Sequence, residues 1–303
     1  MDGVYTDTGE LTRLRLDAHG FSFLPRHSLH SVLSGRKRSR LRGRGLDFEE
    51  LRHYRPGDDI RTMDWRVTNR TGRPHVRVYN EERDRPVMLL VDQRLAMFFG
   101  SRRKMKSVVA AELAALSAWR VLGQGDRVGM ILFNDEQLVQ TRPSRRERTV
   151  LNSLGQLSRM NQQLRADARI ESHSEQLSEA LSAAERMVGH DYLICIISDF
   201  DGWDERCIAS VKTMARHNDL LACQVYDPLE RDISPAANLV VSDGHLQLQI
   251  EPQRGDLGQR FEASFESGQA ELRTELRKHG MPVLSVDTVA PVFDQLRAQL
   301  GRH

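Results

Sequence analysis

Two short apolar runs that end in acids constrain this chain most. Residues 87–91 read VMLLV and precede Asp92, while residues 192–197 read YLICII and precede Ser198 and Asp199. Runs this short and this rich in branched residues are typical of strands buried on both faces of a parallel sheet. Because ligands of open α/β sheets bind outside the carboxyl ends of the strands, we expect Asp92 and Asp199 to lie near each other at such an edge.

Strand and helix patterns alternate through most of the chain. This alternation predicts an α/β fold built on a doubly wound, mostly parallel sheet, accompanied by a smaller β-rich module. The helix at residues 175–188 has Ser174 as its candidate N-cap. The predicted strands are residues 87–91, 127–133, 137–140, 192–197, 220–226 and 281–286, and the predicted helices are residues 104–122, 145–160, 175–188, 205–217, 261–279 and 293–300.

Residues 43–85 form the most distinctive segment of the sequence. Here three acids alternate with three arginines, which suggests an internal ion-pair network. The alternative is a metal site at the acids, with which the neighbouring arginines would compete. Trp65 is a candidate aromatic anchor, and residues 75–79 predict a strand. The alternating residues are Asp58, Asp59 and Asp64 with Arg55, Arg61 and Arg66.

This segment closely resembles the DUF58 family, and the likeness continues more loosely through residues 125–127 and 198–200. It departs from the family pattern at Asn69, where the family usually has alanine. The resemblance implies a von Willebrand factor A-like domain with an extra N-terminal module. It also implies partnership with a MoxR-type AAA+ ATPase, and possible partnership with other von Willebrand A-like proteins. The matching residues are Phe48, Glu49, Leu51, Arg52, Tyr54, Pro56, Gly57, Asp58, Asp59, Arg61, Asp64, Trp65 and Arg70.

The two acid-ended strands resemble von Willebrand factor A domains, which hold a divalent cation at a metal-ion-dependent adhesion site. That site uses Asp-x-Ser-x-Ser after the first strand, a threonine at a later helix and an aspartate after the fourth strand. Asp92 and Asp199 match the two aspartates, but Arg94 and Ala96 stand at the serine positions and Glu175 at the threonine position. Hard cations need oxygen ligands, and arginine offers none. We therefore expect a degenerate site without metal, in which Arg94 pairs with Asp92, Asp199 or Glu175.

The predicted domain organisation is an N-terminal module over residues 1–85 and an α/β domain over residues 86–227 and 254–303. Between the two parts of the α/β domain, residues 238–241 and 245–250 flank a Ser-Asp-Gly turn, which predicts a hairpin. An isolated hairpin is marginally stable in water. We therefore expect residues 228–253 to join the N-terminal module beside the main sheet.

Several classes of function lack support in the sequence. The 303 residues carry a formal net charge of +2, and the three cysteines show no metal-ligand spacing. Nucleophile-elbow, phosphate-loop and paired-histidine motifs are absent from the sequence, so we expect no enzymatic activity. The longest apolar runs are far too short for a membrane span, and residues 1–20 lack a signal-peptide core, which predicts a cytoplasmic protein.

Three functional hypotheses remain. The first is a non-enzymatic interaction module, with Phe98, Phe99, Phe200 and Trp203 as candidate interface residues near the strand ends if they are exposed. The second is a Mg²⁺-dependent protein binder that uses the remaining acids and Ser174. The third is a nucleic-acid-associated protein that uses the basic residues 36–44, but this run lacks interleaved aromatics, so we expect no tight nucleic-acid binding.

Overall fold

The computed structural model describes residues 3–19, 46–56, 58–81, 85–165, 173–231, 239–242, 247–250 and 257–300. Contacts between residues divide the chain into two compact units. One unit comprises Met1–Gly35 and Arg85–His303, and the other comprises Arg36–Asp84. The basic run at residues 36–44 lies outside the described residues.

A six-stranded sheet forms the centre of the larger unit, with the strand order β10-β7-β6-β3-β4-β5. All neighbours pair in parallel except β5, which runs antiparallel to β4 at one edge. Every residue of β3, β4 and β6 is buried, as their continuous apolar sequences predicted. The strands are β3 (Val87–Asp92), β4 (Val128–Phe133), β5 (Leu138–Ser144), β6 (Leu193–Ser198), β7 (Asp219–Tyr226) and β10 (Val283–Asp287).

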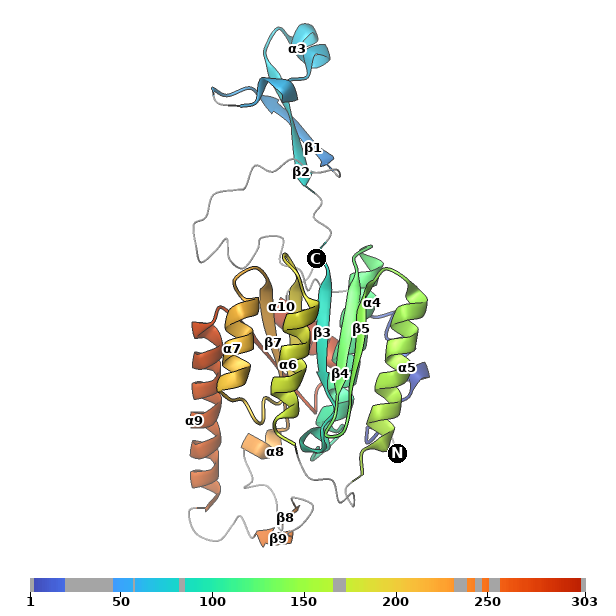
Figure 1. Ribbon diagram of the computed structural model, residues 1–303, viewed down its shortest axis with the longest axis vertical. Helices are drawn as coiled ribbons and strands as arrows, with labels where there is room; N and C mark the ends of the chain where they lie inside the picture. The colour runs from blue at the N-terminus through green and yellow to red at the C-terminus, as the bar shows by residue number, and fades with distance from the viewer. Residues whose placement is uncertain are drawn as a thin grey trace. The chain divides into compact units, whose positions relative to one another are not determined.

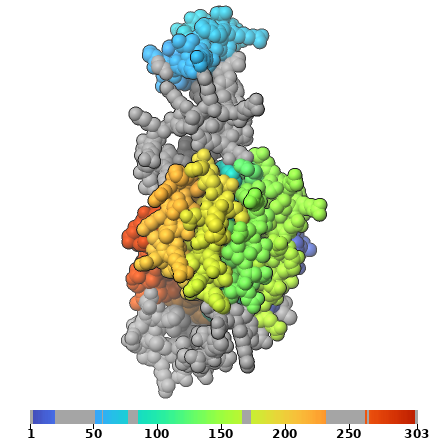
Figure 2. All heavy atoms as spheres, in the orientation of Figure 1, coloured from blue at the N-terminus to red at the C-terminus, as the bar shows by residue number. Residues whose placement is uncertain are grey.

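Helices cover both faces of this sheet (Figure 1). One face packs against α4, α5 and α10, and the other packs against α6, α7 and α9. Figure 2 shows α6 and α7 as one continuous outer layer, in yellow and orange. The predicted doubly wound α/β architecture is therefore confirmed. The helices are α4 (Lys106–Gly123), α5 (Glu147–Gln163), α6 (Gln176–Met187), α7 (Glu205–Met214), α9 (Leu257–Lys278) and α10 (Val292–Leu300).

The N-terminal helix α1 (Thr8–Arg13) also belongs to the larger unit. Asp7 and Glu10 form a capping box at its start. Leu11 is fully buried in the core beside α4 and α5, and the Trp119 indole donates a hydrogen bond to its carbonyl. The prediction that residues 1–85 form one module is therefore wrong at its N-terminal end. The segment is polar overall, but the buried apolar face of α1 is enough to anchor it to the larger unit.

The smaller unit contains an antiparallel pair, β1 (Leu46–His53) and β2 (His75–Glu81). The predicted strand at residues 75–79 is confirmed. The connection between the two strands holds a 3-10 helix, η1 (Ile60–Thr62), and a short helix, α3 (Trp65–Thr71). Both helices contact β2.

The predicted hairpin is present as β8 (Leu239–Ser242) paired antiparallel with β9 (Gln247–Ile250). It follows a short helix, α8 (Pro228–Arg231). Its association with the N-terminal module stays a prediction. Across the described ranges, no helix combines the length and the apolar character needed to cross a membrane.

Candidate functional site

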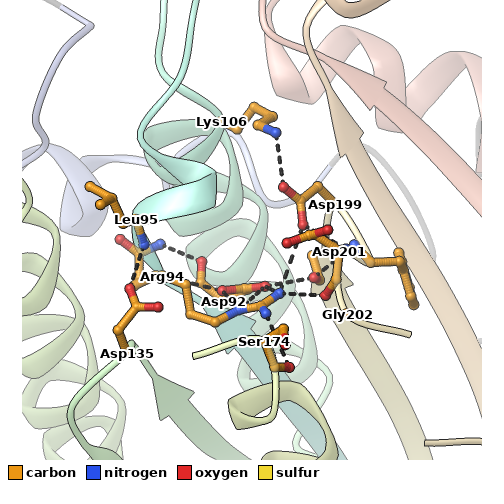
Figure 3. A network of polar contacts seen from close by, with 12 residues as sticks. Asp92, Arg94, Leu95, Lys106, Asp135, Ser174, Asp199, Asp201 and Gly202 are labelled. Atoms are coloured by element: carbon orange, nitrogen blue, oxygen red, sulfur yellow. Dashed lines mark hydrogen bonds and ion pairs between the residues drawn. The ribbon is translucent and has the colours of Figure 1, made fainter. Parts of the chain in front are cut away.

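Two acids meet at the carboxyl edge of the sheet, where the sequence predicted them. Asp92 ends β3 and Asp199 directly follows β6, and these two strands are neighbours. The hydroxyl of Ser198 donates a 2.6 Å hydrogen bond to Oδ2 of Asp92. A guanidinium group lies between the two carboxylates (Figure 3).

That guanidinium belongs to Arg94, whose side chain is only 1% exposed. Its Nε lies 3.0 and 3.1 Å from the two carboxylate oxygens of Asp92, and its Nη2 lies 2.7 Å from Oδ2. Nη2 also donates to the carbonyl of Asp201 at 3.0 Å and lies 3.8 Å from Asp199. Arg94 therefore fills the space between the acids with its own positive charge.

The backbone fixes this arrangement. The Arg94 amide donates to Asp92 Oδ1 at 3.0 Å, so the chain turns back on the acid as it leaves β3. A one-turn 3-10 helix, η2 (Leu95–Met97), follows at once. Its first amide donates to Asp135, which also accepts from the His173 amide. The Arg94 turn is thus tied to two further loops, as Figure 3 shows for Leu95 and Asp135.

Electrostatics favour the charged form of the arginine. Burial by itself lowers the pKa of Arg94, but Asp92 and then Asp199 raise that pKa above its ordinary value. Burial, together with the nearby Asp199, holds the pKa of Asp92 above its ordinary value, although Arg94 and the Ser198 hydroxyl act in the opposite direction. Because arginine stays protonated in proteins, the buried carboxylate of Asp92 faces a permanent cation.

A second buried cation, Lys106, was missed by the sequence analysis. Its Nζ lies 2.8 Å from Asp199 and 2.6 Å from Glu230 of α8. Burial is the largest single influence and raises the pKa of Asp199, but Lys106, the Asp201 amide and Arg94 together lower it further, so this pKa lies below its ordinary value. The sequence does contain one signal for a buried role of Lys106. This lysine begins a helix whose next residues are mostly apolar, and the helix dipole disfavours a cation at that end.

The loop after β6 has an unusual backbone. Phe200 adopts φ +65° and Gly202 adopts φ +75°, both in the left-handed region. A Cβ at Gly202 would stand 2.7 Å from the carbonyl oxygen of Ser174, so only glycine permits this close approach. An aromatic residue with positive φ is uncommon and is held by its surroundings. The loop thereby presents the Asp201 carbonyl to Arg94.

Glu175 does not belong to the site, contrary to prediction. Its side chain is 71% exposed and lies 4.0 Å from Arg206, which is equally exposed. Glu175 is the N-cap residue of α6 and forms no side-chain cap bond, so the prediction of Ser174 as N-cap is also wrong. Instead, the Ser174 carbonyl lies 3.5 Å from Arg94 Nη1. Apolar spacing located the helix but did not fix the direction of its first exposed side chain.

The four aromatic interface candidates have different environments. Phe200 is 4% exposed and packs in the core under α6 and α7, so its assignment to an interface is wrong. Trp203 meets its ring edge-on at 5.8 Å and is partly buried. Phe98 stacks on Tyr5 at 5.6 Å, and Lys106 lies 6.0 Å from the Phe99 ring. Aromatic residues next to strand ends serve here mainly to close the core.

A pocket of about 400 Å³ borders the polar network. It lies between the ends of β6 and β7, helix α8 and helix α9. Ala96 lines this pocket beside the network, but its methyl side chain supplies no oxygen ligand. The lining residues are Ala96, Lys106, Asp199, Phe200, Asp201, Val225, Tyr226, Glu230, Phe265 and Gln269.

The donor set does not fit the divalent cation that a metal-ion-dependent adhesion site holds. Asp92 is engaged by Arg94, and Asp199 is engaged by Lys106. Ala96 has no side-chain oxygen, and Glu175 points to solvent. Within the part of the chain that the structure describes, no group of three or more His, Cys, Asp or Glu residues is arranged to hold a metal.

The acids of residues 58–64 have structural roles in the smaller unit. Asp58 accepts two 2.8 Å bonds from Arg52, which lowers the pKa of Asp58 to about 2. Asp59 caps η1, and Asp64 caps α3 by accepting from the Arg66 and Val67 amides. The side chains of Phe48 and Glu49, and the whole of Gly57, lie outside the described residues.

A comparison with family models matches residues 50–275 to DUF58, described as a protein family of unknown function. This chain belongs to the DUF58 family. The DUF58 chain is 29% identical to the uncharacterized proteins Rv1480 of Mycobacterium tuberculosis and Mb1516 of Mycobacterium bovis. Each of these two matches covers 274 residues, 87% of this chain and 81% of the relative.

Among solved structures, the DUF58 chain is similar to the conserved hypothetical protein BatB from Bacteroides thetaiotaomicron. The identity is 14%, the TM-score is 0.36, and the match covers 65% of this chain and 98% of BatB. A second similar structure is the VWA domain of SpRpn10, with 10% identity, a TM-score of 0.37, and coverage of 72% and 97%.

Proposed function

We propose that this DUF58 protein is a non-enzymatic, cytoplasmic interaction module whose cation position is filled by its own Arg94. The observation that carries this proposal is the buried pair of Arg94 and Asp92, with its three contacts between 2.7 and 3.1 Å. A metal-ion-dependent adhesion site holds a divalent cation between aspartate and hydroxyl ligands. Here the cation is a buried side chain, so a partner has to bind through protein surface and not through a metal ion.

The described side chains offer little for covalent catalysis. All three cysteines are buried, and burial raises the pKa of Cys195 and of Cys207 to about 12. A thiol with such a pKa stays protonated at neutral pH and is a poor nucleophile. The buried acids of the network are each paired with a cation rather than held ready for proton transfer. These features support binding as the function.

The partner we propose is a MoxR-type AAA+ ATPase, with a second von Willebrand A-like protein as a further partner. The support for this choice is the family resemblance carried by residues 48–70, which is an associational argument. The metal-free network adds a physical expectation, since contact with the ATPase should not depend on a divalent cation held by this chain.

The test is complex formation between the purified full chain and the MoxR-type ATPase encoded beside its gene. Light scattering after gel filtration would be recorded without nucleotide, with ADP and with an ATP analogue. The ADP state would be measured with Mg²⁺ and with EDTA, and the ATPase alone in each buffer is the control. We expect a complex whose affinity in the ADP state is the same in both buffers. No complex in any nucleotide state, or one lost in EDTA while the ATPase stays assembled, contradicts the proposal.

A further inference from the structure

The smaller unit displays large apolar side chains to solvent. Among the described residues, four large hydrophobic side chains are strongly exposed, and three of them lie in this unit. They are Leu51 at 39%, Ile60 at 59% and Trp65 at 60% exposed. Single exposed apolar residues are common on proteins, but a tryptophan exposed to this extent is costly to leave in water and is the residue type most enriched at binding hot spots.

Trp65 is held on a rigid support. It is the first residue of α3, directly after the N-cap Asp64, whose carboxylate accepts from two amides at 3.0 and 3.1 Å. The Asp64 amide donates to the His75 carbonyl, which ties this cap to β2. Because the backbone that carries Trp65 is already fixed, its binding orders less of the chain and loses less conformational entropy. The Asp64 cap therefore fixes the position of the backbone from which the Trp65 side chain extends.

The exposed charged side chains of residues 51–76 are mostly positive. Within residues 51–76 the exposed arginines are Arg55, Arg61, Arg66, Arg70 and Arg73, whereas the exposed acid is Asp59. Asp58 forms an ion pair with Arg52, and Asp64 is buried and caps α3. Arginine, like tryptophan, is enriched among binding hot spots because its planar group binds carboxylates through two hydrogen bonds.

We propose that the Trp65 face, defined as Ile60, Trp65 and the five exposed arginines of the connection between β1 and β2, docks onto an acidic protein surface that contains an apolar pocket. This inference rests on the proposed function and names the surface that the chain uses for its ATPase partner. Charge complementarity selects the partner's acidic surface, and the two apolar side chains select its pocket. A second exposed apolar residue in the same connection, Ile60, favours a protein surface over a nucleic acid, which would offer stacking but no matching pocket.

Tryptophan fluorescence gives a direct readout. The chain has three tryptophans, of which Trp119 is 3% exposed and Trp203 is partly buried, so Trp65 is the one open to solvent. Acrylamide should quench Trp65 in the free chain. Saturation with a tryptophan-free variant of the MoxR-type ATPase should protect it. Trp65→Phe marks which part of the signal belongs to this residue.

Affinity measurements with the same ATPase complete the test. Trp65→Ala should weaken the complex about 30-fold, the size expected for a hot spot. Arg66→Glu/Arg70→Glu should weaken it at least tenfold and more strongly at low salt. Leu16→Ala removes an 81% exposed leucine in the other unit and should leave the affinity unchanged. Circular dichroism of each variant would establish that the fold is retained.

Each outcome decides the inference. A complex that forms equally well with Trp65→Ala and leaves Trp65 open to acrylamide overturns the docking surface while the proposed function stands. Absence of any complex with the unmodified chain overturns both. Poor quenching of Trp65 in the free chain would show that this chain covers its own Trp65 face. Saturable binding of a single-stranded oligonucleotide, lost with Trp65→Ala, would assign the face to nucleic acid.

Discussion

At the residue scale, one arginine determines the chemistry of the sheet edge. Arg94 is the largest of the fully buried side chains among the described residues, and it satisfies Asp92 while reaching Asp201 and Ser174. Two carboxylates at one buried edge repel each other and resist ionisation unless a cation lies between them. The guanidinium meets that need with directed hydrogen bonds, which a flexible ammonium group cannot provide in the same geometry.

Arg94→Ala should lower the free energy of unfolding by about 3–5 kcal/mol, because it leaves the Asp92 carboxylate buried without its partner. Urea unfolding followed by circular dichroism measures this change. The matched control is Arg206→Ala, which removes a 71% exposed arginine from a loose pair with Glu175 and should cost less than about 0.5 kcal/mol. Equal, small effects for both variants would show that the Arg94 pair does not stabilise the fold.

At the element scale, a chain of buried amides links the N-terminal segment to the site. The Thr6 amide donates to Asn161 of α5, and Asn161 in turn donates to Gln93, which follows Asp92. Gln93 then donates to the carbonyls of Asp92 and Ser107. Asn161 and Gln93 are fully buried, so each lost bond leaves a polar group that water cannot reach.

Asn161→Ala should lower the free energy of unfolding by about 2–4 kcal/mol, because it leaves both the Thr6 amide and the Gln93 side-chain carbonyl oxygen without a hydrogen-bond partner. Hydrogen exchange should show faster exchange for residues 6–14 in this variant than in the unmodified chain. Gln163→Ala, at an exposed position at the end of the same helix, serves as the control. Unchanged exchange near residue 6 would show that the amide chain does not hold the N-terminal segment.

Periodicity in the sequence was enough to predict the main sheet and its helices. Each predicted strand and helix of residues 86–300 has a counterpart within a few residues, because buried strands here are continuous apolar runs and the helices are amphipathic. Local patterns also placed Asp92 next to Asp199. They could not find Lys106 or Glu230, because a contact between α4 and α8 depends on tertiary packing of residues 124 positions apart. For the same reason, local patterns could not predict that the Glu175 side chain is exposed or that Phe200 is buried in the core.

At the scale of the whole molecule, acids held by ion pairs or hydrogen bonds contribute to the dependence of stability on pH. Asp58, Asp199, Asp227 and Glu275 all have a pKa below the ordinary value. A lowered pKa in the folded state contributes stability above the pKa of the unfolded chain, near 4, and that contribution is lost as the pH falls through the folded pKa. We therefore expect the protein to lose stability progressively between about pH 5 and pH 2.

Lys106→Met tests the part of this acid sensitivity that belongs to the site. Loss of the buried ammonium should lower the free energy of unfolding by about 3 kcal/mol at pH 7. Because Asp199 then loses its strongest stabilising partner, the difference from the unmodified chain should shrink as the pH falls below about 4. Urea unfolding at several pH values measures both effects, with the exposed Lys212→Met as control. Parallel curves for Lys106→Met and the unmodified chain would contradict this coupling.

In the function that we propose for the whole protein, Arg94 stands where a divalent cation would bind in a metal-ion-dependent adhesion site. Isothermal titration calorimetry of the unmodified, EDTA-treated and dialysed protein with Mg²⁺ and with Mn²⁺ tests it most directly. We expect no saturable heat up to millimolar concentrations of either ion. Micromolar binding of either ion that is abolished by Asp92→Asn would show a working metal site and contradict the claim.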